Sequence, residues 1–325
     1  MIANSPTLKN LAVLKLSDNH ITSDGLVALA RSPLLSQLTE LHLDGNQVWQ
    51  KSIGTFDSKF GYAPSPIIYK SLVIVAADNQ GGGYLAALDQ KTGTIAWRTA
   101  RGNASTYSSP TIARVGGREQ LLIGGGDRLA SYDPGTGEQL WSTPCLSEST
   151  CGTVVTDQDR IYASGGYPDK ETVCLDSDGN QLWSNQIKLY EPSPIIVNGN
   201  LFAVTDNGIA YLWQGSDGTE IWRSRLGGEF SSSPVLVGGL VYVGDLSGNC
   251  FVLKASNEGL ETIATNQLGS DMYASPAVSN GQMFLRIGTG DRSARSEQLV
   301  CIAAPTEQQA DSTDTSADLD PEASN

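Results

Sequence analysis

The chain has 325 residues and a formal net charge of −14 at pH 7. A charge of this sign argues against nucleic acid or an anionic membrane surface as the main partner. Glycine accounts for 35 residues and charged side chains for only 17% of the chain, which favours short strands joined by tight turns. No apolar run approaches the ~18 residues of a membrane span, and the N-terminus lacks the basic and apolar regions of a signal peptide. The composition therefore predicts a soluble, mostly β protein.

The first module, residues 1–48, carries a leucine-rich pattern. Leu-x-x-Leu-x-Leu-x-x-Asn-x-Ile begins at Leu11 and recurs from Leu38, a shift of 27 residues. Between the copies, the Ser-Asp-Gly sequence at 23–25 can cap a helix. The pattern resembles the leucine-rich-repeat family, which implies a short α/β segment with structural roles for Asn19 and Asn46. Two repeats cannot bury their own faces, so the segment is expected to lean on another module.

The second module, residues 49–304, repeats about every 42 residues, and six copies are counted. Each of the earlier copies contains a glycine followed four residues later by a tryptophan, and most contain a Ser-Pro marker before the first apolar strand. A unit of this length with four short strands is typical of a β-propeller blade. The glycine would supply a positive φ in the last turn of the blade, and the tryptophan would pack between neighbouring blades. The predicted docking residues are Trp49, Trp97, Trp141, Trp183 and Trp222, with Gly93, Gly137, Gly179 and Gly218.

Two stretches carry a family resemblance. Asp89-Gln-Lys-Thr-Gly-Thr-Ile-Ala-Trp97 and Asp133-Pro-Gly-Thr-Gly-Glu-Gln-Leu-Trp141 resemble the tryptophan-docking motif of pyrroloquinoline-quinone-like (PQQ-like, quinoprotein-type) β-propeller repeats. Relatives of this class include outer-membrane assembly lipoproteins of the BamB type. The resemblance covers residues 49 to about 304 and implies an all-β propeller of about six four-stranded blades. It also implies the periplasm or cell envelope, although this N-terminus shows no export signal. Members usually have seven or eight blades, so one or two N-terminal blades are expected to be missing.

The two ends of the second module raise the question of how the blades close. The last copy ends at Ala304 without a tryptophan and supplies three strands. We hypothesise that the segment around Trp49 adds the fourth strand from the other end of the chain, which would remove two exposed sheet edges. Beyond the module, residues 305–325 contain six acids, no Lys or Arg and no aromatic residue. This segment is predicted to be a disordered acidic tail.

The histidine content limits the available chemistry. The only histidines are His20 and His42, so residues 49–325 contain none. This removes Ser-His-Asp and Cys-His mechanisms and His-ligated metals from the larger module. Phosphate-binding loops and kinase motifs are also missing from the sequence.

The five cysteines include no Cys-x-x-Cys pair, which argues against a zinc site. Cys174, Cys250 and Cys301 lie in strand-like runs and are expected to be buried structural thiols. Cys145 and Cys151 flank a short loop, and whether they pair is left open.

An enzyme is the main alternative, because quinoprotein dehydrogenases use the same repeat. For those enzymes the resemblance implies a vicinal Cys-Cys disulfide, a Ca²⁺ held by Glu, Asn and Asp, a stacking Trp and a catalytic Asp. This chain has no Cys-Cys pair, and docking accounts for all its tryptophans except Trp213. The acids that follow second strands are each expected to cap their own turn: Asp78, Asp127, Asp206 and Asp245.

No catalytic residue, metal or cofactor is therefore predicted. A PQQ- and Ca²⁺-dependent oxidoreductase stays one alternative function. The sensor or interaction portion of a serine/threonine-kinase-related bacterial signalling protein is another.

The candidate site is a set of aromatic residues that precede the first strands of the repeats. In a propeller these strands begin at one mouth of the central channel, where a ring of aromatic and hydroxyl groups can bind a ligand. Packing between inner strands is the competing interpretation. The function predicted is a non-enzymatic scaffold that binds a protein, peptide or small ligand at the channel mouth or on the blade faces. The candidate residues are Tyr62, Tyr107, Tyr190, Phe230 and Tyr273.

Overall fold

The computed structural model describes residues 13–15, 40–42 and 48–303, except 55 and 292–293. The chain divides into two units, one comprising Met1–Ser52 with Gln90–Thr94 and the other Ile53–Asp89 with Ile95–Asn325. In the first unit, β1 (Val13–Lys15) pairs in parallel with β2 (Glu40–His42). Val13 lies opposite Glu40, so the register equals the 27-residue shift of the leucine-rich pattern. The predicted helix and the remaining leucine-rich positions lie outside the described residues.

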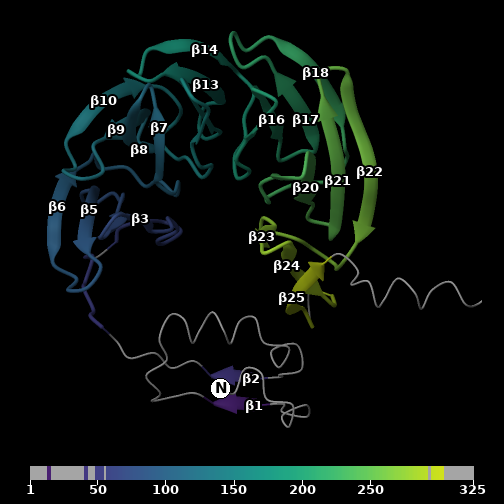
Figure 1. Ribbon diagram of the computed structural model, residues 1–325, viewed down its shortest axis with the longest axis horizontal. Coiled ribbons are helices and arrows are strands. Elements are labelled where there is room, and N and C mark those ends of the chain that lie inside the picture. The colour runs from purple at the N-terminus through teal and green to yellow at the C-terminus, as the bar shows by residue number, and fades with distance from the viewer. Residues whose placement is uncertain (1–12, 16–39, 43–47, 55, 292–293, 304–325) are drawn as a thin grey trace, which may run out of the picture. The chain divides into compact units, whose positions relative to one another are not determined.

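The second unit consists of six antiparallel sheets, each built from strands that follow one another in sequence (Figure 1). We call them blades 1 to 6. Blade 1 has β3 (Ile67–Tyr69), β4 (Leu72–Ala76), β5 (Tyr84–Asp89) and β6 (Ile95–Ala100). Blade 2 has β7 (Thr111–Val115), β8 (Arg118–Gly124), β9 (Arg128–Tyr132) and β10 (Gln139–Pro144). Blade 3 has β11 (Val155–Thr156), β12 (Arg160–Gly165), β13 (Glu171–Asp176) and β14 (Gln181–Asn185).

The remaining three blades follow the same order. Blade 4 has β15 (Ile195–Val197), β16 (Asn200–Val204), β17 (Ile209–Trp213) and β18 (Glu220–Arg225). Blade 5 has β19 (Val235–Val237), β20 (Leu240–Gly244), β21 (Asn249–Ser256) and β22 (Gly259–Gln267). Blade 6 has β23 (Ala277–Ser279), β24 (Gln282–Thr289) and β25 (Ser296–Ala303). The first strands β3, β7, β11, β15 and β19 lie side by side in chain order, which is the arrangement of a β-propeller.

The last repeat supplies three strands in the part of the chain that the structure describes, as predicted. Five blades are four-stranded, whereas the sheet β23–β24–β25 has three strands within the described residues. β25 is exposed at seven of its eight positions and pairs only with β24 in that part of the chain. The hypothesis that the segment around Trp49 supplies the missing strand stays a prediction.

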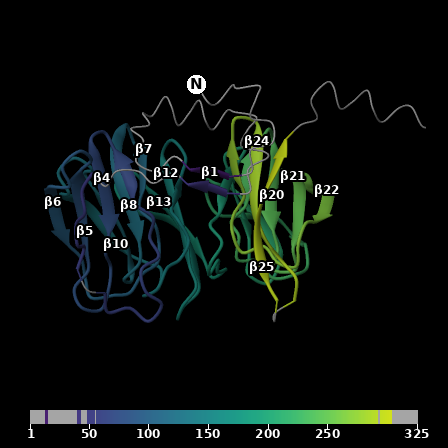
Figure 2. The ribbon, with the colours of Figure 1, turned by 90° about the horizontal axis from the view of Figure 1, so that it is seen from below.

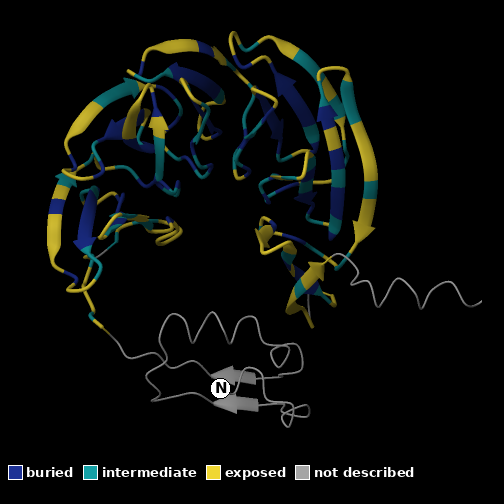
Figure 3. Ribbon diagram, viewed as in Figure 1, coloured by how far each residue is buried: buried dark blue, intermediate teal, exposed yellow. Residues whose placement is uncertain are grey.

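Burial follows the position of a strand within its blade (Figure 3). The two middle strands are covered on both faces; β16, for example, is buried at every position. In blades 2 to 5 each middle strand lies between two neighbouring blades, so its side chains are mostly apolar on both faces and do not alternate. The fourth strands β6, β10, β14, β18 and β22 are largely exposed and carry a β-bulge.

The Ser-Pro marker of the repeat has a structural explanation. The backbone N–H at the marker position of one blade donates to the marker serine of the next blade, at donor–acceptor distances of 2.8 to 2.9 Å. These bonds join adjacent first strands near their starts. The proline that follows each marker serine has no N–H to donate, so the bond between blades uses the N–H of the residue before it. The pairs are Ser65 with Ser109, Thr153 with Ser193, Ser193 with Ser233, and Ser233 with Ser275.

Two of the three thiols expected to be buried are buried. Cys174 and Cys250 are 0% and 3% exposed, whereas Cys301 is exposed. Cys301 lies on β25, an edge strand of the three-stranded blade, so its side chain gains no cover. All five cysteines, Cys145 and Cys151 included, are free thiols. Burial raises the pKa of Cys145 to about 12 and that of Cys151 to about 11, which keeps both protonated near neutral pH.

Candidate binding face and inter-blade docking

The topology gathers the candidate residues at one end of the blades. In an antiparallel blade, the turns between the second and third strands lie at the same end as the connections to the next blade (Figure 2). Tyr107, Tyr190, Phe230 and Tyr273 lie in such connections, and Tyr62 lies just before β3. The acids after the second strands lie in the turns at this end. We call this end of the second unit the connection face.

Among the described residues, no ring contact joins two of the five candidate aromatic residues. Tyr107 packs against Phe60, with ring centroids 5.8 Å apart, and Tyr62 packs against Phe56 at 5.1 Å. Tyr273 is 57% exposed, and its ring lies near the Arg295 guanidinium and not near either of these pairs. Phe56 and Phe60 had not been selected from the sequence, because they precede the first repeat and belong to no periodic pattern.

Phe230 is a packing residue. Its side chain is 2% exposed and lies 5.7 Å from the ring of Phe251, in the apolar cluster between blades 4 and 5. The packing interpretation therefore holds for this position. Tyr190 and Phe230 line a common cavity.

The cavity at Tyr190 has a volume of about 450 Å³ and is formed by connections and turns of blades 3, 4 and 5. Its apolar walls include Ile187, Tyr211 and Leu246, whereas Lys170 and Glu229 supply opposite charges. This volume lies within the range of small-ligand and side-chain pockets, roughly 300–1,000 Å³. A cavity with apolar walls and both signs of charge suits a polypeptide segment.

Asp206 holds the walls of this cavity together. Its carboxylate accepts the backbone N–H of Tyr190 at 3.0 Å and that of Glu191 at 3.2 Å. Its backbone carbonyl accepts the N–H of Phe230 at 2.9 Å. One residue of a turn in blade 4 thus fixes the connections that enter and leave that blade. The expectation that Asp206 caps its own turn is wrong, because its oxygens bond to the preceding connection.

Lys188 and Tyr190 present the accessible chemistry of the cavity. The Lys188 ammonium lies 5.4 Å from the centroid of the Tyr190 ring, within the range of a cation–π contact. Burial, together with the neighbouring Cys151 and Glu191, raises the pKa of Tyr190, so its hydroxyl stays protonated and available as a donor. The site therefore offers a cation, an aromatic ring and a neutral hydroxyl on one rim.

The other acids of the set behave differently from one another. Asp245 caps its own turn, as expected: its carboxylate accepts the backbone N–H groups of Ser247 and Asn249 at 2.9 and 2.8 Å. Asp78 instead forms a buried ion pair with Arg101, with Nε to Oδ1 at 2.8 Å. Burial raises the pKa of Asp78 and the arginine opposes that shift.

These carboxylates do not fit a calcium–quinone site. Those of Asp78, Asp206 and Asp245 are engaged by Arg101, by backbone N–H groups of a connection and by the aspartate's own turn. Within the described part of the chain, no group of three or more His, Cys, Asp or Glu side chains is placed to hold a metal ion.

The tryptophans lie at the boundaries between repeats. Each predicted docking glycine contacts the tryptophan of the preceding repeat and not the one four residues after it. A Cβ on Gly137 would lie 2.4 Å from Trp97, and one on Gly179 or Gly218 would lie 2.6 Å from Trp141 or Trp183. Trp49 and Gly93 show the same contact at 2.6 Å within the first unit. Only glycine fits, since each position also has φ between +68° and +84°.

Each indole also donates a hydrogen bond to a carbonyl of the turn that it contacts. Trp183 Nε1 donates to Gly215 O at 3.1 Å and Trp222 Nε1 to Ser256 O at 2.7 Å. Trp97 donates to Pro134 O at 3.2 Å and Trp49 to Gln90 O at 2.8 Å. The ring and its N–H thus fix one repeat to the next.

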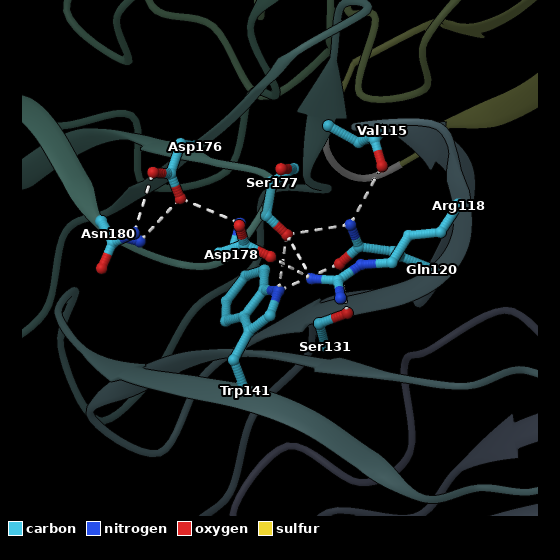
Figure 4. Close-up of polar contacts among 9 residues, drawn as sticks. All are labelled: Val115, Arg118, Gln120, Ser131, Trp141, Asp176, Ser177, Asp178 and Asn180. Carbon is cyan, nitrogen blue, oxygen red and sulfur yellow. Dashed lines mark hydrogen bonds and ion pairs between the residues drawn. The ribbon is translucent and has the colours of Figure 1, made fainter.

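The contact at Trp141 has an additional polar network that the sequence did not reveal (Figure 4). Trp141 Nε1 donates to Ser177 O and to Gln120 Oε1, both at 3.0 Å. The buried Gln120 amide donates in turn to Val115 O and Ser177 O, while Ser131 Oγ donates to Gln120 Oε1. Gln120 was missed because it follows Arg118 and Glu119 in the polar first half of β8, where no periodic pattern distinguishes it.

Comparison with known proteins identifies the family. Residues 15–224 and 169–264 match the model of the family described as outer membrane protein assembly factor BamB. The chain belongs to the BamB family. It is 25% identical over 227 residues to BamB of Legionella pneumophila, covering 70% of this chain and 48% of that protein. It is 25% identical over 264 residues to BamB of Shewanella oneidensis, covering 72% and 62%. The chain thus spans about half to three fifths of the length of these relatives.

The solved structures agree with the fold. The computationally designed protein Ika8 matches with a TM-score of 0.52 at 13% identity, covering 72% of this chain and 69% of that one. This similarity concerns the architecture alone. Among the residues that the structure describes, no helix has the length and apolar character needed to cross a membrane.

Proposed function

We propose that this BamB-family protein is a non-enzymatic scaffold of the cell envelope that binds another protein at the cavity between blades 3, 4 and 5. The observation that carries the proposal is Asp206, whose carboxylate fixes one connection and whose backbone carbonyl fixes the next, so that this residue holds the cavity walls in place. A preformed site binds without the entropic cost of ordering its loops. The names of the relatives, outer membrane protein assembly factors, support a role in assembling envelope proteins.

The partner proposed is a polypeptide segment with an acidic and an apolar residue close together. Lys188 and Tyr190 would receive the acidic group by charge and by a hydroxyl donor, and the apolar walls of the cavity would receive the other side chain. The cavity also contains Glu191 and Glu229, so a uniformly acidic partner would be repelled. Recognition would then depend on a mixed segment.

The test is affinity capture from an envelope extract with matched variants. Lys188→Glu combined with Tyr190→Ala changes the rim of the cavity and leaves the Tyr190 backbone N–H in place. Tyr273→Ala is the control, because it removes an exposed aromatic residue of the connection face at another blade. We expect the double variant to lose proteins that the wild type and Tyr273→Ala both retain, at unchanged Tm. Identical captured sets for all three proteins would overturn the proposal.

A further inference from the structure

The interface between blades 5 and 6 lacks the tryptophan that fills the other interfaces of the second unit. In blade 4, Trp222 lies opposite Leu212 at the bulge of the fourth strand. The same register in blade 5 places Ala264 opposite Val252, again directly after the bulge. Ala264 therefore occupies the docking position. The substitution is hidden in the sequence, because the turn of blade 5 is a two-residue hairpin that does not carry the usual motif.

A cavity of about 380 Å³ lies on the face of blade 5 that carries Ala264, and its lining includes Val252, the residue opposite Ala264, as Leu212 is opposite Trp222 in blade 4. Val252 and Asn266 line it from blade 5, and Asn266 shares a strand face with Ala264 because the two positions are two residues apart. Met283, Leu285 and Ile302 line it from blade 6. Most of the cavity wall is apolar.

The parts of the chain outside the described residues contain no aromatic side chain that could fill this slot. The chain leaves the slot at Ala303, which lines it, and residues 304–325 contain no Phe, Tyr or Trp. Residues 1–47 contain none either. An occupant of the kind found at the other interfaces must therefore come from outside these 325 residues.

We propose that this slot binds an aromatic side chain, of the size of an indole, carried by an extended segment of another protein. The evidence for the occupant is internal: Trp97, Trp141, Trp183 and Trp222 occupy the equivalent space at four interfaces of the same chain. A polypeptide source is favoured because Ile302 and Ala303 of β25 line the slot and β25 pairs with β24 alone among the described residues, which leaves its other edge able to take up an extended strand. The slot shares no lining residue with the Asp206 cavity, so the two sites can be tested separately.

The methionines provide a direct probe. The sequence has three, and two of them, Met272 and Met283, pack in the cluster between blades 5 and 6. Protein labelled with ¹³C at the methionine methyls would be titrated with N-acetyl-L-tryptophanamide. We expect a saturable ring-current shift of the Met283 methyl with no shift of Met1, and a rise in Tm of roughly 2–4 °C near saturation. An unchanged Met283 signal up to the solubility limit of the probe would overturn the proposal.

Three variants test where the probe binds. Ala264→Trp should fill the slot, raise Tm and abolish the response to the probe, whereas Ile263→Trp, which adds an indole at the neighbouring exposed position, should leave it intact. If Ala264→Trp does not fold, Ala264→Phe serves the same purpose. Trp222→Ala should open a second slot, between blades 4 and 5, so this variant should bind a second equivalent of the probe.

Free tryptophan is the comparison ligand for the source. Its charged ends do not occur within a polypeptide, so weaker binding than that of the amide supports a protein segment. Equal or tighter binding of free tryptophan would overturn the polypeptide source.

Discussion

Two neighbouring interfaces, between blades 4 and 5 and between blades 5 and 6, can be compared directly. They share the same hydrogen bond between first strands but differ in how the side chains of the fourth strands pack. Ser233 N–H donates to Ser275 Oγ at 2.8 Å, just as Ser193 N–H donates to Ser233 Oγ one blade earlier. Outside this shared bond, Trp222 packs near Phe202 and donates to Ser256 O, whereas the next interface has Ala264 at the docking position. The inner bonds align successive blades, and the indole determines whether the outer part of the interface is filled.

The apolar clusters record the same difference. The cluster between blades 4 and 5 contains eleven buried residues, and the one between blades 5 and 6 contains four, two of them Cys250 and Met272. Sulfur-containing side chains are adaptable and fill irregular gaps without specifying one packing. The fifth interface is therefore expected to contribute less to stability than the other four, and the following changes test that comparison.

The largest effect is expected for Trp183→Ala. The indole is 7% exposed, packs with Tyr162 at a centroid distance of 6.0 Å and donates to Gly215 O. Its removal leaves a cavity and takes away one of the two hydrogen bonds to the Gly215 carbonyl, so the free energy of unfolding should fall by about 3–5 kcal/mol. Urea unfolding measures this, with Met283→Ala in the fifth interface as the comparison. An equal loss for both variants would contradict the distinction between the interfaces.

The second effect concerns the glycine that receives an indole. Gly179 has φ of +84°, and a Cβ there would lie 2.6 Å from Trp141. Gly199 has a similar φ of +78° but no atom within 4 Å of such a Cβ. Gly199→Ala should cost about 1–2 kcal/mol of backbone strain, and Gly179→Ala should cost roughly 1–3 kcal/mol more because the indole must move. Equal losses in thermal unfolding would show that the glycine serves only the turn.

A smaller effect is expected from the polar network at Trp141. Gln120→Leu keeps the volume but leaves Ser131 Oγ without its acceptor, at 0% exposure, which should cost about 1–3 kcal/mol. Adding Ser131→Ala removes the unsatisfied hydroxyl and should recover part of that loss. A double variant less stable than Gln120→Leu would mean that the hydroxyl has another partner.

The sequence predicted the propeller because its period and its tryptophans come from local requirements of each blade. A bulge, a turn and a ring recur about every 42 residues, and together they specify a fourth strand. Which glycine contacts which tryptophan could not be seen, since Gly137 meets Trp97 across a blade boundary, 40 positions away. Of the Asp206 cavity, the sequence predicted Tyr190 and Phe230 but not the cavity itself. Its walls come from three blades, and its key bonds are made by backbone N–H groups. Ala264 escaped notice because a missing residue leaves no motif.

The smallest effect is expected in blade 6, where an ion-pair network lies at the surface. Asp271 accepts two hydrogen bonds from Arg295, at 2.7 and 2.8 Å, and this interaction lowers the pKa of the carboxyl. A lowered pKa in the folded state stabilises the protein above the unfolded value, roughly pH 4, and the contribution disappears as pH falls through the folded value.

Arg295→Gln should therefore lower the free energy of unfolding only slightly at pH 7, because water screens the ion pair. The difference from the wild type should shrink and then vanish as unfolding is measured at pH values that fall through the folded pKa of Asp271. A difference that persists there would mean that Arg295 acts through packing against Tyr273, whose ring lies 6.0 Å from the guanidinium, and blade 6 would then resemble the filled interfaces more than the comparison allows.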